Sequence, residues 1–169
     1  MIVRRFGSDE WRSYRDLRLR ALYESPDAFG STFSHESERT DDDWQSRLGS
    51  GATSPRDLPL IAESEGKAVG LAWARIDESQ PDVAHLYQVW VAPSYRRIGI
   101  GAALLASAID WARSVGARSI ALGVTCGDNP ALHLYRRAGF APAGDPKPLR
   151  PGSAVLSQPM ELVLNRGSA

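Results

Sequence analysis

The feature that most constrains the fold of this chain is a strand that passes through a glycine-rich turn directly into a long helix. Residues 83–91 form a mostly apolar stretch that stops before Pro93, because proline cannot continue a central hydrogen-bonded ladder. Apolar side chains then recur at helical spacing over residues 100–115, and Gly116 is placed to end that helix. The segment therefore predicts a strand, a tight turn and a helix whose N-terminus lies beside the end of the strand.

The turn between strand and helix has the composition of an anion-binding site. The first turn of a helix carries unpaired N–H groups and a partial positive charge. Gly99 and Gly101 let a ligand approach the backbone closely, because no Cβ stands in the way. Arg96 and Arg97 add positive charge beside those amides, so the turn predicts a cradle for phosphate groups. An ordinary tight turn without a ligand is the structural alternative.

Three kinds of phosphate-binding loop compete for this segment. A Walker loop is excluded because no Gly-Lys-Ser/Thr sequence follows the glycines. A dinucleotide fingerprint needs a third glycine and an acidic residue about 20 residues further on. Neither is present, since Ala102 follows Gly101 and residues 119–121 are Ser-Ile-Ala. The segment fits best the pyrophosphate loop of an acyl-CoA-binding protein, in which Arg or Gln precedes Gly-x-Gly/Ala after a strand ending in Val-x-Pro.

The rest of the chain alternates between strand and helix patterns. It predicts a single α/β (α+β) domain of order β-α-α-β-β-β-α-β-α-β, with a mixed central sheet of about six or seven strands and about four flanking helices. The expected elements are a strand over 2–6, a helix over 11–22 capped by Ser8, an aperiodic stretch over 29–38, a short helix over 44–48, a loop over 49–59, strands over 60–63 and 68–73 joined at Glu65-Gly66, a strand over 83–91, a helix over 100–115, a strand over 119–124, a helix over 129–138, and a final strand over 155–164 interrupted early by Pro159.

Composition excludes several classes of function. The 20 Lys and Arg residues balance 20 Asp and Glu residues, so a domain that coats nucleic acid is not expected. The single cysteine, Cys126, and three histidines without zincin spacing exclude a disulfide framework and the common zinc sites. No apolar segment follows the charged first residues, and none approaches the length of a membrane span. We therefore expect a cytoplasmic protein, one domain over residues 1–169, with no metal, nucleic-acid or membrane partner.

Two motifs in order resemble the GNAT superfamily of N-acetyltransferases. Residues 86–105, from Leu-Tyr-Gln-Val-Trp-Val-Ala-Pro through the glycine turn, resemble the central motif of that superfamily. Residues 130–140, ending in Leu-Tyr-Arg-Arg-Ala-Gly-Phe, resemble its A-x-x-L-Y-x-x-x-G-F segment at the expected distance. The first helix and residues 26–31, Pro-Asp-Ala-Phe-Gly-Ser, resemble a bacterial, small-molecule-type branch. The resemblance covers most of the chain.

This resemblance implies an enzyme that transfers an acetyl group from acetyl-CoA to a primary amine by direct attack on the thioester. The acceptor it implies is a small-molecule amine, with a protein N-terminus or lysine as the alternative within the same chemistry. A non-catalytic acyl-CoA-binding or sensing module is the alternative from another class. A homodimer is compatible with all three. The resemblance also implies the cofactor-binding positions Val89, Trp90, Val91, Arg96, Arg97, Ile98, Gly99, Ile100, Gly101, Ala102, Asp128, Asn129 and Tyr135.

Tyr135 is the candidate proton donor to the departing thiolate, carried over from the tyrosine of the second motif. Helical spacing agrees, because Asp128, Ala131 and Tyr135 are three and four residues apart. The family usually has Asn where this chain has Asp128, so the contact to pantetheine falls either to that carboxylate or to Asn129. A core tyrosine with a satisfied hydroxyl is the alternative for Tyr135.

The general base is less directly indicated. Some family members carry a Glu where this chain has Gly123, which cannot serve. His85 is the candidate instead, because strict strand alternation would put it on one face with Val89 and Val91, and an unperturbed imidazole titrates near pH 6.5. A structural histidine is the alternative. Cys126 is interpreted as a small buried residue and not as a nucleophile.

Overall fold

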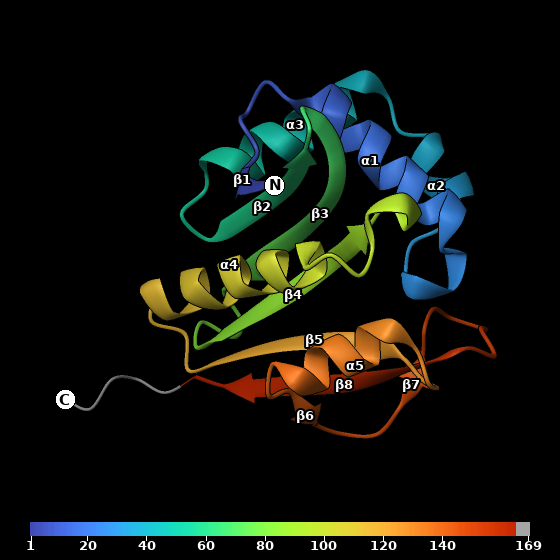
Figure 1. The fold of residues 1–169 in the computed structure, drawn as a ribbon, viewed down its shortest axis with the longest axis vertical. Helices are drawn as coiled ribbons and strands as arrows, with labels where there is room; N and C mark the ends of the chain where they lie inside the picture. The colour runs from blue at the N-terminus through green and yellow to red at the C-terminus, as the bar shows by residue number, and fades with distance from the viewer. Residues whose placement is uncertain (165–169) are drawn as a thin grey trace.

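The computed structural model describes residues 1–164, in which eight strands form one mixed sheet of order β1-β2-β3-β4-β5-β8-β6, with β7 pairing β8 (Figure 1). The predicted fold class is confirmed. The short strands β6 and β7 were not predicted. The elements are β1 (Ile2–Arg5), α1 (Trp11–Glu24), the 3-10 turn η1 (Pro26–Ala28), α2 (Phe33–Ser37), α3 (Asp41–Thr53), β2 (Asp57–Ser64), β3 (Lys67–Ile76), β4 (Val83–Val91), η2 (Pro93–Tyr95), α4 (Ile100–Ser114), β5 (Ser119–Thr125), α5 (Pro130–Arg137), β6 (Ala141–Pro142), β7 (Lys147–Pro148) and β8 (Leu156–Val163).

The sheet is antiparallel except at its centre. The strands β1 to β4 pair antiparallel in chain order, and β5 pairs antiparallel with β8. The parallel pair β4–β5 joins these two halves, and its register extends only from Val83 opposite Ser119 to His85 opposite Ala121. Beyond His85 the two strands have no register with each other, so they diverge toward their C-terminal ends (Figure 1).

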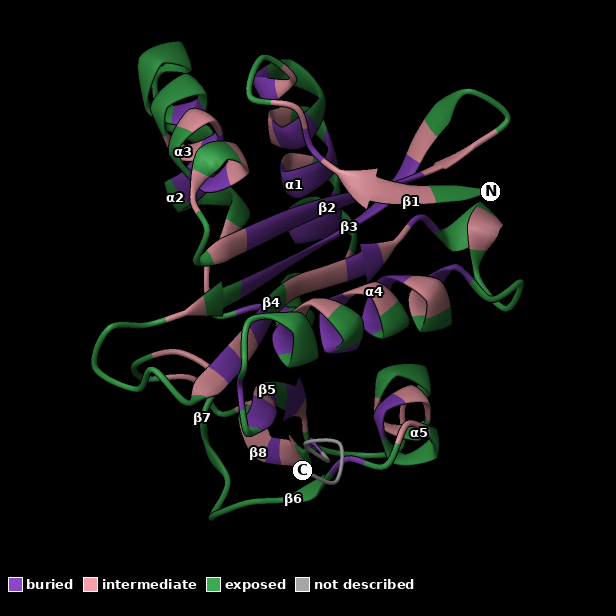
Figure 2. Cartoon of the chain, turned by 90° about the vertical axis from the view of Figure 1, so that its left-hand side faces the viewer, coloured by how far each residue is buried: buried purple, intermediate pink, exposed green. Residues whose placement is uncertain are grey.

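Helices cover both faces of the sheet, and the side chains of β3 alternate between the two hydrophobic clusters this creates. Ala72 and Ala74 pack in the cluster under α4, whereas Leu71 and Trp73 pack in the cluster under α1 and α3. Figure 2 shows the buried residues of these three helices on the sides that face the sheet. The alternation explains why β3 reads as a continuous apolar run, since both of its faces are covered.

A β-bulge in β4 reverses the alternation that the sequence predicts. Trp73 is opposite Tyr87, but Leu71 is opposite Trp90, so an additional residue enters β4 between these pairs. Gln88, at this point, has a φ of +62°. His85 therefore shares its face with Tyr87 and Trp90, while Val91 lies on the opposite face. The prediction of one face from residue 83 to 91 was wrong.

Several helix and strand limits also differ from the sequence prediction. Ser8 does not cap α1, because Glu10 occupies that position. The helix α3 begins at Asp41, where Thr40 and Asp43 form a capping box, and it extends to Thr53, into the first part of the predicted loop. Position 51 inside this helix accepts only glycine, because a Cβ there would lie 2.2 Å from a ring atom of Trp73. The other differences are α2 within the aperiodic stretch, Pro59 paired within β2, and Pro159 paired with Gly123 within an uninterrupted β8.

Candidate active site

A cavity of about 820 Å³ opens where β4 and β5 diverge. Val89 of β4, Gly123 of β5 and Ser157 of β8 line the gap between the strands, and Tyr135 of α5 closes it on one side. From there the cavity extends over the sheet face covered by α1 and α3, as far as Arg18. The divergence of two parallel strands thus creates a passage from one face of the sheet to the other.

Tyr135 is buried where α5 meets the cavity. Its side chain is 5% exposed, and its ring packs against Phe140 with the centroids 5.8 Å apart. Among residues 1–164 the hydroxyl has no hydrogen-bond partner, although it belongs to a residue that lines the cavity. Burial raises the pKa of Tyr135 well above its usual value, so the phenol holds its proton throughout the physiological range. A core tyrosine with a satisfied hydroxyl does not describe this residue.

The predicted anion cradle forms an exposed turn before α4. Gly99 caps α4 with a φ of +92°, and Arg97 has a φ of +65°. Arg97, Ile98 and Gly99 are exposed, so the first amides of α4 lie beside an accessible cationic side chain. Gly101 lies closer to the protein, where a Cβ would come within 3.2 Å of Leu134.

Arg96 and Trp90 hold this turn in place, which the sequence did not indicate. The Nε of Arg96 donates to the carbonyl oxygen of Val91 at 2.9 Å, and its guanidinium forms an ion pair with Glu24 at 2.9 Å. The same carboxylate accepts a hydrogen bond of 2.9 Å from Nε1 of Trp90. Glu24 at the end of α1 therefore fixes both the end of β4 and the start of the turn. Of the two arginines of this turn, Arg97 is the one that forms no ion pair within residues 1–164.

Asn129 and Asp128 have different roles at the start of α5. The Oδ1 of Asn129 accepts from the N–H of Leu132 at 2.9 Å, and its Nδ2 donates to the carbonyl oxygen of Thr125 at 2.9 Å. Asn129 is thus an N-cap whose donors and acceptor are already used. The side chain of Asp128 is 88% exposed and lies 2.5 Å from Nε2 of His133. Asp128 and Ala131 face solvent, whereas Tyr135 is buried. The three residues have helical spacing but do not share one face toward the cavity, so that prediction was wrong.

The structure does not place His85 beside Tyr135. The imidazole lies on the sheet face that also carries Tyr87, and the two rings stack with centroids 6.1 Å apart. Its Nδ1 is buried and has no hydrogen-bond partner among residues 1–164. Tyr87 lines the cavity and His85 does not, so any proton transfer from the acceptor to His85 needs a bridging group. Gly123 lies close to Ser157, whose Oγ would be 2.7 Å from a Cβ at that position.

Two residues interpreted from sequence have other surroundings in the structure. Cys126 is exposed, so its interpretation as a buried residue was wrong. Glu36 of α2 is buried between Arg39 and Arg47, although a carboxylate in an acidic stretch of sequence would be expected at the surface. Arg18 was missed, although an arginine within the apolar stripe of the first helix was the signal that could have found it.

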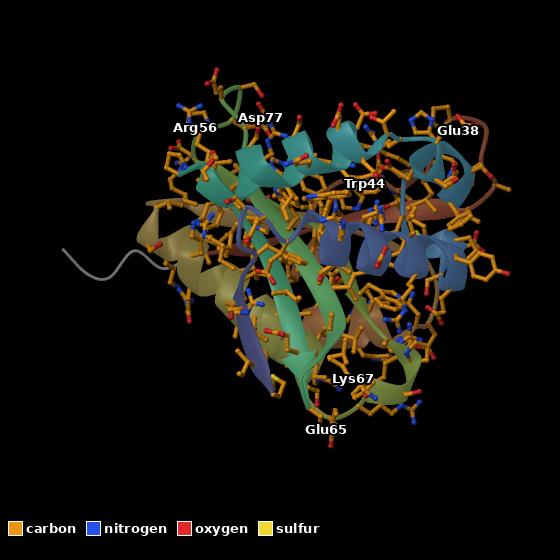
Figure 3. The ribbon with its side chains drawn as sticks, turned by 90° about the horizontal axis from the view of Figure 1, so that it is seen from above. Glu38, Trp44, Arg56, Glu65, Lys67 and Asp77 are labelled. Atoms are coloured by element: carbon orange, nitrogen blue, oxygen red, sulfur yellow. The ribbon has the colours of Figure 1, made fainter. Side chains whose placement is uncertain are left out.

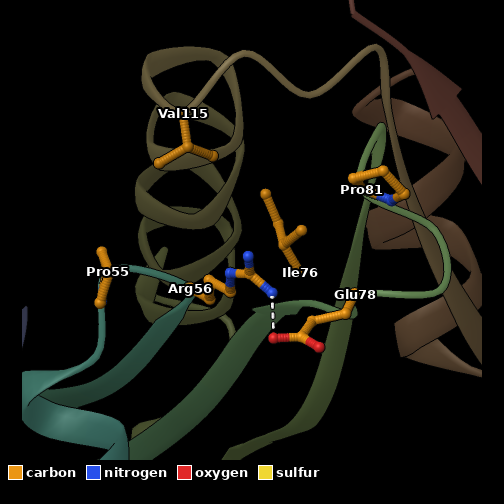
Figure 4. A pocket seen from close by; sticks show the side chains of 6 residues that line it. All are labelled: Pro55, Arg56, Ile76, Glu78, Pro81 and Val115. Carbon is orange, nitrogen blue, oxygen red and sulfur yellow. Dashed lines mark ion pairs between the residues drawn. The ribbon is translucent and has the colours of Figure 1, made fainter.

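A second cavity, of about 550 Å³, lies at the other end of α4 from the glycine turn. Its main polar feature is an ion pair of 2.7 Å between Arg56 and Glu78, whose side chains are 52% and 85% exposed (Figure 4). Within residues 1–164 no group of three or more His, Cys, Asp or Glu side chains is arranged to hold a metal ion. No helix in that range is long and apolar enough to cross a bilayer.

Comparison with known proteins agrees with this architecture. A family model described as the acetyltransferase (GNAT) family matches residues 11–140. The structure resembles that of a GNAT-family acetyltransferase from Streptococcus pneumoniae, with a TM-score of 0.83, 22% identity, and coverage of 96% of this chain and 99% of that one. It also resembles yncA from Salmonella typhimurium, solved with its cofactor acetyl-CoA, with a TM-score of 0.80, 19% identity, and coverage of 100% and 96%.

The fold and the family match define the class: the chain belongs to the GNAT acetyltransferase family. It is 30% identical over 138 residues to a mycothiol acetyltransferase from Clavibacter sepedonicus, covering 82% of this chain and 42% of that protein. It is 37% identical over 102 residues to one from Sanguibacter keddieii, covering 57% and 32%. The chain therefore spans less than half the length of these curated relatives.

Proposed function

We propose that this chain transfers an acetyl group from acetyl-CoA to the primary amine of a small molecule. The observation that carries the proposal is the hydroxyl of the buried residue Tyr135, which has no hydrogen-bond partner among residues 1–164 and belongs to a side chain that lines the cavity at the gap between β4 and β5. This gap lies between the anion cradle before α4 and the cavity on the other face of the sheet. Membership in the GNAT family and the acetyl-CoA in a structural neighbour both support it.

Each group has a defined task in the proposed reaction. The exposed amides around Gly99 and the guanidinium of Arg97 bind the phosphates of the cofactor. The thioester then lies near Val89, where the neutral amine of the acceptor attacks its carbonyl carbon. The C–S bond breaks as the C–N bond forms, and the Tyr135 phenol gives its proton to the departing sulfur. His85 takes the proton of the amine through a bridging water and releases it to solvent, and the phenolate regains a proton from solvent.

A small acceptor is favoured by the shape of the cavity. Phe29 from the segment after α1 and Leu149 from the segment before β8 line it, together with the sheet face. Arg150 ties these two segments together, since its guanidinium donates to the carbonyl oxygens of Pro26 at 2.7 Å and Phe29 at 2.8 Å. The resulting rim suits a compact ligand better than an extended polypeptide. The names of the mycothiol acetyltransferase relatives also point to a small molecule.

A free-thiol assay over a panel of amines and peptides tests this function. A Cys126→Ser background removes the exposed thiol of the protein, which would otherwise react with the reagent. We expect CoA release that depends on a small amine and is lost in Tyr135→Phe. Release with peptides alone would establish a protein acceptor instead. Tight binding of acetyl-CoA in calorimetry without release in any combination would establish the non-catalytic binding module.

A further inference from the structure

Arg18 of α1 is a buried charge that the fold leaves unpaired. Its side chain is 3% exposed, and it lines the cavity that leads to Tyr135. The atoms Nε and Nη1 are buried and have no hydrogen-bond partner among residues 1–164, and no carboxylate in that range forms an ion pair with it. The guanidinium lies 4.8 Å from the ring centroid of Phe29, which orients it without satisfying its donors. A buried, unpaired charge is strongly unfavourable unless a ligand completes it.

The neighbouring carboxylate does not neutralise Arg18. Glu36 is 1% exposed, but its two oxygens are engaged by Arg39 and by Arg47, the latter at 3.5 Å. Arg47 also lines the cavity. Two guanidinium groups therefore engage the one carboxylate whose charge reaches Arg18, which leaves an excess of positive charge and five N–H donors on Arg18.

The other charged residues of the cavity form a separate group. Asp57, at the start of β2, accepts a hydrogen bond of 2.8 Å from Nε1 of Trp73 and lies 3.9 Å from Arg75. Asp77 follows the end of β3. Figure 3 shows Asp77 near Arg56 on one side of the helical layer, with Glu38 on the opposite side and Trp44 between them. Asp57 is thus paired with Arg75, and within residues 1–164 neither Asp57 nor Asp77 forms an ion pair with Arg18.

We propose that Arg18 binds a carboxylate of the acceptor, so that the substrate of this enzyme is a primary amine that also carries a carboxylate, such as an amino acid. The inference rests on the proposed function, because it identifies the anionic end of a molecule whose amine reacts beside Tyr135. A carboxylate suits the site since a guanidinium presents two parallel N–H groups in the geometry that two carboxylate oxygens accept. Arg47 adds positive charge at the same end.

Matched acceptor pairs test this inference. The twenty common amino acids and their primary amides are compared as acceptors by initial rates of CoA release. The amide lacks only the negative charge, and its less basic amine is deprotonated more readily, so the comparison is biased against the proposal. We expect at least one amino acid to have a kcat/KM about tenfold or more above its amide. The ratio should fall to about one in Arg18→Gln and stay unchanged in Arg12→Gln, a matched control at an exposed arginine of the same helix.

Thermal unfolding gives a second readout that does not depend on turnover. Replacing an unpaired buried charge with an apolar side chain of similar length is expected to stabilise the free protein, so the Tm of Arg18→Met should exceed that of the parent. The preferred amino acid should raise the Tm of the parent and leave that of Arg18→Met unchanged. A lower Tm for free Arg18→Met would show that the fold already stabilises the guanidinium, which would overturn the inference.

The two proposals fail in different ways. If the parent protein does not bind acetyl-CoA in calorimetry, the proposed function is wrong. If amides or simple amines are acetylated as well as amino acids, the function stands and the carboxylate inference is wrong. If acetyl-CoA binds and no amino acid is acetylated, the carboxylate inference is again overturned.

Discussion

The hydroxyl of Tyr14 in α1 donates a hydrogen bond of 2.9 Å to Oε1 of Gln88, the bulge residue of β4. These residues are 74 positions apart in the chain. Burial raises the pKa of Tyr14, so the phenol remains a donor. A residue that is not glycine rarely holds a positive φ without support. The helix α1 thus supports β4 at the bulge, where Gln88 lines the cavity.

Tyr14→Phe should destabilise the protein by about 0.5–1.5 kcal/mol, because it removes the hydrogen bond and leaves the ring packing intact. Urea unfolding measures this change. Tyr23→Phe is the matched control, since Tyr23 lies on the same helix with 76% of its surface exposed. Equal stability of both variants would show that the bulge does not need the contact with Tyr14.

Gly101→Glu should abolish the binding of acetyl-CoA. The new side chain would push against Leu134 and bring a carboxylate among the proposed phosphate-binding amides. Gly49→Glu is the matched control, because it introduces the same charge within α3, where no heavy atom lies within 4 Å of the added Cβ. Calorimetry that finds equal affinity in both variants would remove the phosphate assignment.

Tyr135→Phe should lower turnover by about 10²–10⁴, the usual cost of losing a general acid. The phenylalanine ring keeps its contact with Phe140, so the affinity for acetyl-CoA and the Tm should stay near those of the parent. Steady-state rates at saturating acetyl-CoA measure the effect. Turnover within about twofold of the parent would show that Tyr135 only packs in the core.

His85→Gln tests the general base through a pH profile. If the imidazole takes the proton of the amine, kcat/KM should fall on the acid side of the profile, and the substitution should remove that limb. Two acceptors of different basicity are needed as a control. A limb that follows the basicity of the acceptor and survives in His85→Gln would show that the enzyme selects the neutral amine without this residue.

Glu10 should contribute to stability only above the acid range. The hydrogen bonds from Arg4, at 2.7 and 2.9 Å, lower the pKa of the Glu10 carboxyl below its usual value. Because the folded pKa is depressed, the contribution is complete above the unfolded pKa of about 4.3 and is lost as pH falls through the folded value. Unfolding between pH 7 and pH 3 should therefore show a smaller acid loss in Glu10→Gln. A loss equal to that of the parent protein would contradict this assignment.

Local sequence signals predicted the parts of this fold that depend on local interactions. The strand, glycine turn and helix up to Gly116 were predicted correctly because proline, glycine and apolar spacing act within a few residues. The bulge at Gln88 was not, since the contact that supports it comes from Tyr14. The length of α3 was underestimated because Gly51 lowers helix propensity, and its compensating contact with Trp73 arises only in the folded chain.

In the candidate site, too, local motifs could be predicted from the sequence, whereas features that depend on distant contacts could not. Tyr135 and the cradle glycines were assigned by motif, and the structure gives them suitable surroundings. Asn129 was expected at the cofactor, but a cap is indistinguishable from a ligand contact in sequence. Arg18 matches no motif. Its place in the apolar stripe of α1 indicates burial, but the absence of a partner among residues 1–164 follows from the arrangement of Glu36, Arg39 and Arg47 and could not be predicted.

The junction of β4 and β5 has a mechanical consequence. Three residue pairs, at Val83, Ala84 and His85, join one half of the sheet to the other on this side. Beyond these three pairs, β4 and β5 each present an edge to the gap. A strand edge carries N–H and C=O groups that are not paired with a neighbouring strand. The two halves of the sheet are thus joined by hydrogen bonds at one end of the β4–β5 junction and are separate at the other. A molecule bound in the gap would bridge the two strand edges and restrain both. Amide hydrogen exchange along both edges should therefore slow together when it binds.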